Sequence, residues 1–161
     1  SGADASEEML KIAQKKHSEK EFFQAKSNEL PFEKESFQGC LTFHFIMHLD
    51  EVIFKKTIDE IHRILSKNGT FVFDIPVKSR RKILNQNQEN WHAALSFNQD
   101  EIEKFIKNKF EIRKKFGLLI IPIHRIPKRF RKYFLTFDFL LSNFGLLKNL
   151  SSYHIYELRK I

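Results

Sequence analysis

Cysteine is almost missing from this sequence, because Cys40 is the only one among 161 residues. One thiol excludes a disulfide framework within the chain and a zinc site built from several cysteines. No apolar run reaches the roughly 18 residues that a membrane-spanning helix needs. No signal peptide is recognisable at the N-terminus as given. These absences favour a cytoplasmic protein, since thiols stay reduced in that compartment.

Acidic residues are scarce in the last third of the chain. Residues 1–109 hold 17 basic and 17 acidic side chains, whereas residues 110–161 hold 11 basic and 3 acidic ones. The whole net charge of +8 therefore comes from the C-terminal third. Such a segment attracts anions, which include nucleic acid, anionic lipid and acidic substrates.

Apolar spacing predicts strands that alternate with helices. Ser6 is typical of a helix N-cap, and Asn68 with Gly69 is suited to end a helix. We expect helices over about 6–18, 51–66 and 98–108, and strands over 21–25, 39–44, 70–76, 110–118 and 152–160. This order favours an α/β fold with a parallel sheet covered by helices on both faces.

Two stretches interrupt the alternation, at about 77–95 and 119–149. Insertions of this kind shape a pocket or a contact surface on a regular scaffold. We therefore expect residues 1–161 to form a single domain with these two insertions.

Six segments carry a resemblance to a known family. They are "GADASEEMLKIA" (2–13), "LPFEKESF" (30–37), "LTFHFIMHLDE" (41–51), "IHRILSKNGTFVFDIP" (61–76), "FNQDEIEKFIKNKFEI" (97–112) and "YHIYELRK" (153–160). In their order and spacing they resemble the class I S-adenosylmethionine-dependent methyltransferases of the type 11 group. The resemblance implies a Rossmann-like sheet that binds S-adenosylmethionine over the carboxyl ends of its strands.

The resemblance also implies roles for particular residues. Asp4 would hold the ribose, with Ala5 and Met9 beside the adenine. Lys26 and Ser27 would lie at the adenine edge, and His44 and Phe45 at the site of methyl transfer. The implied cofactor-binding residues are thus Asp4, Ala5, Met9, Lys26, Ser27, His44 and Phe45. His48 follows on the acceptor side and is the candidate general base.

Three departures from the family pattern bear on activity. The first strand and the glycine-rich loop under the methionine end of the cofactor are absent ahead of Asp4. Lys26 stands where the family commonly has Asp, and an ammonium group accepts no hydrogen bond from adenine. Gln38 replaces the usual Asp after Phe37. We therefore expect an N-terminally truncated sheet that binds cofactor poorly.

A missing first strand leaves two strand edges unpaired. Either the sequence is a fragment whose N-terminal part lies elsewhere, or a second copy pairs with the exposed edge in a homodimer. We expect the fragment.

The acceptor has to be inferred from the insertions. Phe130, Phe134, Phe137, Leu141 and Phe144 lie at helical spacing behind a cluster of basic residues. One interpretation is a helix packed over the sheet or the acceptor pocket. Another is an interfacial helix that brings 128–148 to an anionic membrane and admits a lipid-like acceptor. No recognition module for nucleic acid accompanies the charge, so a nucleic-acid partner is not expected.

Two functions follow from these observations. The first is methyl transfer from S-adenosylmethionine to a small-molecule or lipid-like acceptor in the intact protein, with the chain as given inactive. The alternative is a non-catalytic methyltransferase-like module for binding or assembly. No metal site is expected, because His44, His48 and His62 lack acidic or thiolate partners at ligand spacing. His62 is expected to be a solvated helix residue.

Overall fold

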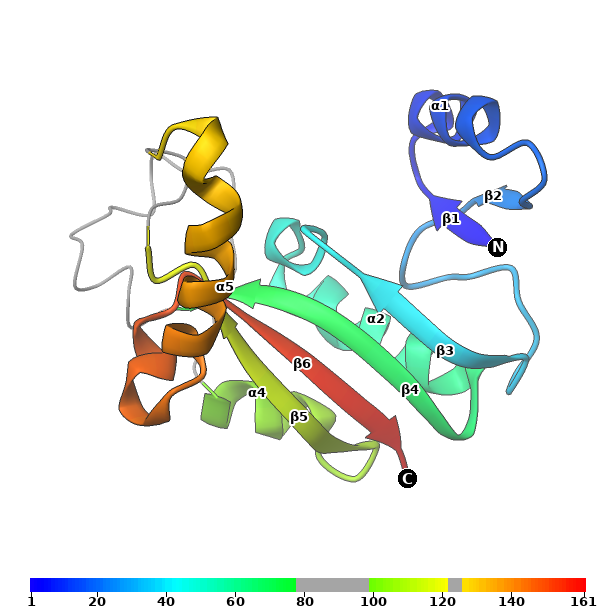
Figure 1. Cartoon of the computed structure of the whole chain (residues 1–161). Helices are drawn as coiled ribbons and strands as arrows, with labels where there is room; N and C mark the ends of the chain where they lie inside the picture. The colour runs from blue at the N-terminus through cyan, green and yellow to red at the C-terminus, as the bar shows by residue number, and fades with distance from the viewer. Residues whose placement is uncertain (78–98, 122–125) are drawn as a thin grey trace.

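The computed structural model describes residues 1–77, 99–121 and 126–161. A four-stranded sheet forms its centre, and a separate two-stranded sheet lies at the N-terminal end (Figure 1). The strands are β1 (Gly2–Asp4), β2 (Phe22–Gln24), β3 (Phe37–Thr42), β4 (Leu65–Pro76), β5 (Phe110–Leu118) and β6 (Tyr153–Lys160). The α-helices are α1 (Glu7–Lys16), α2 (Glu51–Ile64), α4 (Gln99–Ile106) and α5 (Arg131–Ser142). Short 3-10 helices are η1 (Ile46–His48), η4 (Lys128–Phe130) and η5 (Gly145–Leu150).

The central sheet has the strand order β3-β4-β6-β5. β3 is parallel to β4, while β6 is antiparallel to both β4 and β5. Tyr153 at the start of β6 pairs with Pro76 and with Leu118. The carboxyl ends of β4 and β5 therefore meet at one edge of the sheet.

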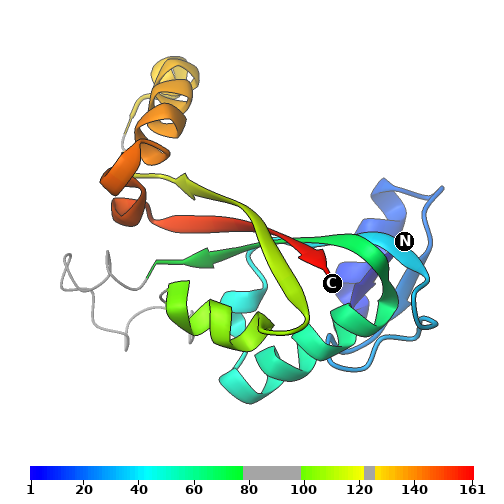
Figure 2. The same cartoon turned by 90° about the horizontal axis from the view of Figure 1, so that it is seen from below.

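The hydrophobic core lies where α2 and α4 cover one face of this sheet (Figure 2). α2 contributes Phe54, Ile58 and Ile61, and α4 contributes Ile102 and Ile106, all buried. Facing them are Phe71, Phe73 and Ile75 of β4 with Tyr156 and Leu158 of β6. These alternate strand residues point to one face, which is the period expected of a strand with one buried side.

The expected α/β class is confirmed, with a mixed rather than all-parallel central sheet. Ser6 caps α1 as predicted, since its hydroxyl accepts a hydrogen bond from Met9 N at 3.3 Å. α2 ends at Ile64, two residues before the expected end, and β4 begins directly at Leu65. Asn68 has the predicted left-handed conformation (φ 65), but it lies within the long strand β4. The start of the third expected helix and the insertion at 77–95 fall largely outside the described residues.

β1 and β2 form a parallel pair that is not hydrogen-bonded to the central sheet in the part of the chain that the structure describes. α1 packs against this pair. In Figure 1, β1 and β3 run toward the same side of the molecule with no strand between them. The inner edges of both strands are therefore unpaired among the described residues.

Polar side chains anchor α5 to the end of β5. Asp138, only 2% exposed, accepts hydrogen bonds from Leu119 N at 2.8 Å and Ile121 N at 2.7 Å. Asn143 accepts from Gly117 N at 3.0 Å and donates to Gly117 O at 3.2 Å. These bonds fix α5 at the edge where β4 and β5 end.

Gly117 has no room for a side chain at this junction. A Cβ there would lie 2.2 Å from Ser151 Oγ and 2.3 Å from Ser142 O. We predict that Gly117→Ala lowers the free energy of unfolding by about 1–3 kcal/mol, because the backbone of α5 has to move. Urea denaturation measures this loss.

Gly39→Ala is the matched control, since its Cβ would meet only Thr70 O at 3.8 Å. Equal effects of the two substitutions on the urea midpoint would contradict the packing of α5 against β5.

Candidate functional site

A cavity of about 600 Å³ opens between the two sheets. Residues 1–5 line one wall and residues 39–43 line the other, with Ser27, Phe45 and Thr57 also on its surface. The cavity thus occupies the space between the unpaired edges of β1 and β3. Its volume is in the range of pockets that bind cofactors and drug-sized ligands.

Four of the seven cofactor-binding residues expected from the sequence line this cavity. They are Asp4, Ala5, Ser27 and Phe45. Met9, Lys26 and His44 are exposed and lie outside its lining. The structure therefore brings together residues from β1, from the segment after β2 and from the segment after β3, as the carboxyl-end geometry of an α/β sheet requires.

Asp4 ends β1 with its carboxylate at the surface of the cavity. Its Oδ1 accepts a hydrogen bond from Ser6 N at 2.8 Å. Its main-chain oxygen accepts from Ala25 N at 3.0 Å, which ties the end of β1 to the end of β2. Among the lining residues that the structure describes, this carboxylate is the only side-chain charge.

Ser27 is held by α2 rather than left open to a ligand. Its hydroxyl lies 2.8 Å from Thr57 Oγ1, and Thr57 is 1% exposed. This hydrogen bond therefore joins the segment after β2 to α2 at the surface of the cavity. Lys26 lies beside it with its side chain exposed and offers only donors.

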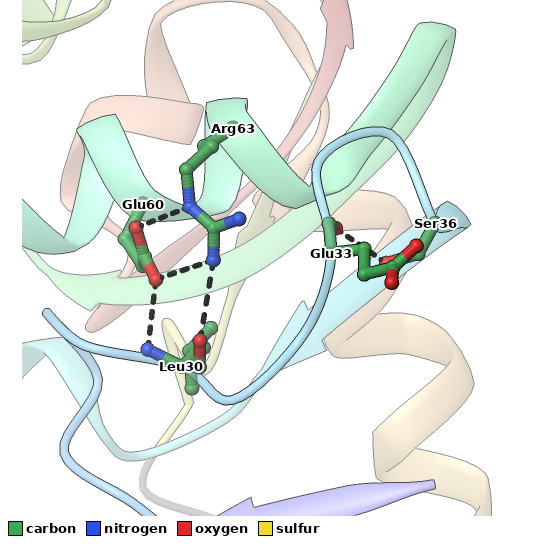
Figure 3. Close-up of polar contacts among 5 residues, drawn as sticks. All are labelled: Leu30, Glu33, Ser36, Glu60 and Arg63. Atoms are coloured by element: carbon green, nitrogen blue, oxygen red, sulfur yellow. Dashed lines mark hydrogen bonds and ion pairs between the residues drawn. The ribbon is translucent and has the colours of Figure 1, made fainter.

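Glu60 and Arg63 of α2 clamp the same segment at Leu30 (Figure 3). Glu60 Oε1 accepts from Leu30 N at 2.8 Å, and Arg63 Nη2 donates to Leu30 O at 3.2 Å. Arg63 also donates to Glu60 through Nε at 2.9 Å and Nη2 at 2.8 Å. One ion pair thus satisfies both backbone polar groups of Leu30. The clamp therefore holds the segment after β2, which lines the cavity at Leu30, against α2.

His44 follows β3 in a left-handed backbone conformation (φ 51) that β3 and β4 stabilise together. Its N–H donates to Asp74 Oδ1 at 2.7 Å, and its ring Nδ1 lies 3.6 Å from Asp74 Oδ2. Asp74 on β4 is only 5% exposed. Strained non-glycine residues of this kind are enriched at ligand sites.

Asp74 is the residue that sequence reasoning missed. The sequence feature that could have identified it is an acidic residue inside the apolar strand "TFVFDIP", since a buried carboxylate needs hydrogen-bond partners. Those partners come from the end of β3, so only the strand pairing identifies them.

Other candidate residues have simpler surroundings. His48 is exposed at the end of η1. Burial raises the pKa of the Cys40 thiol to about 11, so it stays protonated at neutral pH.

The expectation that His62 is solvated is wrong, because its Nε2 is buried and its ring packs edge-on against Phe110. Within residues 1–77, 99–121 and 126–161, no group of three potential metal ligands is found.

Comparison with known proteins identifies the family of the N-terminal part. The family described as "Methyltransferase domain" matches residues 1–73, which reach from β1 through most of β4. This match supports a class I methyltransferase assignment for residues 1–73. No curated protein sequence matches it.

Solved structures share its fold at low sequence identity. A methyltransferase from Thermotoga maritima is 18% identical with a TM-score of 0.72, over 99% of this chain and 72% of that one. A methyltransferase from Methanosarcina mazei is 13% identical with a TM-score of 0.67, over 99% of this chain and 81% of that one. The cyclase SpnF is 15% identical with a TM-score of 0.66, over 99% of this chain and 64% of that one. Because a cyclase shares the fold, the family match carries the assignment of methyl transfer.

S-adenosylmethionine is the cofactor that this family match implies, and the cavity fits its nucleoside half. Asp4 brings carboxylate oxygens to the cavity, as a sugar diol would require, and Ala5 brings apolar surface. The methionine half carries its own carboxylate, yet no Lys or Arg is among the described residues that line the cavity. The described residues therefore complete only one end of the cofactor site.

Ionisation of Glu60 makes the stability of the clamp depend on pH. The hydrogen bond from Arg63 holds the pKa of Glu60 below its ordinary value of 4.5, and Leu30 N acts in the same direction. A lowered pKa stabilises the fold above the ordinary value, and this stabilisation is lost as pH falls through the folded-state pKa. We predict that Glu60→Gln lowers the urea midpoint at pH 7 and that this loss is smaller at pH 3, because protonation of Glu60 increasingly removes the same charge from the parent.

Glu33→Gln is the control for this measurement. Ser36 contacts the main-chain oxygen of Glu33, not its carboxylate (Figure 3). The control should leave the midpoint unchanged at both pH values. An equal loss for Glu60→Gln at pH 3 and pH 7 would contradict a clamp that depends on charge.

Proposed function

We propose that this protein transfers a methyl group from S-adenosylmethionine to a small-molecule or lipid-like acceptor. The observation that supports it is the convergence of Asp4, Ala5, Ser27 and Phe45 on one cavity at the ends of separate strands. In this proposal Asp4 accepts hydrogen bonds from the ribose hydroxyls, while Ala5 and Met9 border the adenine. Lys26 and Ser27 lie at the adenine edge.

The reacting end of the proposed site lies after β3. His44 and Phe45 border it, and Asp74 fixes the backbone at His44. The bound cofactor supplies an electrophilic methyl group, and the protein contributes mainly proximity and alignment. His48 is the proposed base for an acceptor that has to lose a proton.

Completion of the site requires a further strand between β1 and β3. The two unpaired edges face the same cavity, and their backbone groups are satisfied when a strand pairs with both. We propose that an N-terminal segment of the intact protein supplies this strand and the glycine-rich turn for the methionine end. The expected cytoplasmic location and single-domain organisation belong to the same proposal.

Calorimetric titration with S-adenosylhomocysteine tests the cofactor site. We expect weak or no binding to the 161-residue chain and micromolar binding to a protein extended upstream of Ser1 in the reading frame. In the extended protein, Asp4→Asn should weaken binding about 10- to 100-fold, because charged hydrogen bonds to the diol are lost. The Asn side-chain oxygen can still accept from Ser6 N, so the fold should persist.

Glu8→Gln removes a neighbouring exposed carboxylate of α1 and is the matched control, with no expected change in affinity. Equal affinities of Asp4→Asn and the parent would overturn the role of Asp4.

A non-catalytic role in binding or assembly is the second candidate function. It is favoured by the Ser27 hydroxyl, which Thr57 already engages, and by the exposed ammonium group of Lys26. Failure of the extended protein to bind S-adenosylhomocysteine would support this role. Sedimentation analysis separates it from a homodimer in which a second copy pairs with the open strand edges.

A further inference from the structure

α5 buries polar residues, whereas an ordinary amphipathic surface helix buries apolar ones. Its buried residues are the polar Asp138 and Ser142, which are 2% and 0% exposed and lie one turn apart. Ser142 Oγ donates to Asp138 Oδ2 at 3.3 Å, and Asp138 binds the backbone that follows β5. These hydrogen bonds, together with stacking of Phe139 on Phe116 of β5 at 6.2 Å between ring centroids, attach α5 to the domain.

The outward side of α5 is apolar. Tyr133, Phe137 and Leu140 follow at i, i+4 and i+7 and are 64%, 56% and 65% exposed, and Phe144, two residues after the end of α5, is 74% exposed. An amphipathic helix normally turns such a stripe toward the core. Four residues of the face considered above for packing over the sheet are also exposed, so that interpretation is wrong for Phe130, Phe134, Phe137 and Phe144. Large contiguous apolar surfaces that remain exposed mark sites of interaction.

Positive charge surrounds the beginning of this stripe. Lys128, Arg129 and Lys132 are exposed. The Arg129 guanidinium lies 4.6 Å from the Phe130 ring, and Lys132 Nζ lies 4.9 Å from the Tyr133 ring. Asp138 is the only acidic residue in 126–150, and its carboxylate is buried. The exposed surface is thus both apolar and cationic.

We propose that this α5 surface, made of Lys128, Arg129, Lys132, Tyr133, Phe137, Leu140 and Phe144, binds the interface of an anionic lipid membrane. Basic side chains meet anionic headgroups while aromatic and leucine side chains enter the acyl boundary. Nucleic acid would satisfy the charge but not the apolar stripe. No described helix is long and apolar enough to cross a bilayer. In the proposed complex α5 lies in the plane of the interface, with its exposed aromatic residues toward the acyl chains.

The position of α5 connects this surface with the proposed acceptor. The backbone that Asp138 holds follows β5 directly, at the edge where β4 also ends (Figure 1). A bound membrane would therefore lie on the side of the sheet where His44 follows β3. The link to a lipid-like acceptor rests on the proposed function, whereas membrane binding itself does not.

Vesicle flotation tests the proposal without cofactor or acceptor. We expect the chain to float with vesicles of phosphatidylcholine containing 30% phosphatidylserine at low salt. Binding should fall at least tenfold on pure phosphatidylcholine and in 0.5 M NaCl, because the electrostatic attraction is then absent or screened. Absence of binding to the anionic vesicles at low salt would overturn the proposal.

Paired substitutions separate the two parts of the surface. Phe137→Ser with Leu140→Ser, and separately Lys128→Glu with Arg129→Glu, should each reduce binding at least tenfold while the circular dichroism spectrum is retained. Val52→Ser is the apolar control, because Val52 of α2 is 64% exposed. Lys55→Glu with Lys56→Glu is the charge control, with the same change in net charge on exposed residues of α2.

Two further outcomes would count against the proposal. Equal loss in the charge control would show general electrostatic attraction without a role for α5. If Phe137→Ser with Leu140→Ser instead converts a dimer to a monomer and leaves flotation unchanged, a second copy covers the stripe.

Discussion

Backbone hydrogen bonding at strand edges is the constraint on which this structure depends. An interior strand of a sheet pairs on both sides, but β1 pairs with β2 and β3 pairs with β4 only, within the described residues. Both inner edges border a cavity of about 600 Å³. The unpaired edges of β1 and β3 therefore separate the two sheets, and the space between them is the cavity of the candidate cofactor site.

With no ladder between the two sheets, side chains of α2 connect them. Thr57 holds Ser27, and Glu60 with Arg63 holds both backbone groups of Leu30. Phe32 adds edge-to-face contacts with Phe23 of β2 and Phe37 of β3, with ring centroids 5.1 and 4.8 Å apart. These contacts place Asp4 and Phe45 on one cavity although their strands do not pair. The family match to residues 1–73 covers the parts that form this arrangement.

The two ends of the sheet differ in how polar groups are used. At the N-terminal end, the clamp of Glu60 and Arg63 satisfies a loop while apolar α2 residues fill the core. Near the C-terminus, Asp138 of α5 and Asn143 directly after it form hydrogen bonds with the backbone, and most aromatic residues of α5 remain exposed. Burying these polar groups is favourable because each finds backbone partners. The exposed aromatic surface is a direct consequence.

Much of the secondary structure was predictable from local patterns. The spacing of Phe54, Ile58 and Ile61 predicted α2, Ser6 predicted the start of α1, and β5 was predicted over its observed residues 110–118. Motif order also indicated the class I methyltransferase fold before any contact was known. The partnership of Asp74 with His44 was not predictable, since it joins residues 30 apart through the pairing of β3 and β4.

By itself, the sequence determined the approximate positions of most helices and strands and indicated the family, because each depends on residues close together in the chain or on their order along it. The tertiary structure alone decided that Thr57 engages Ser27, that His62 is partly buried and that α5 turns its polar side inward. The aromatic spacing in α5 is equally compatible with packing inward or facing outward. The backbone N–H groups of Leu119 and Ile121, which follow β5, donate hydrogen bonds to Asp138. These bonds turn the polar side of α5 inward and leave the aromatic stripe facing outward.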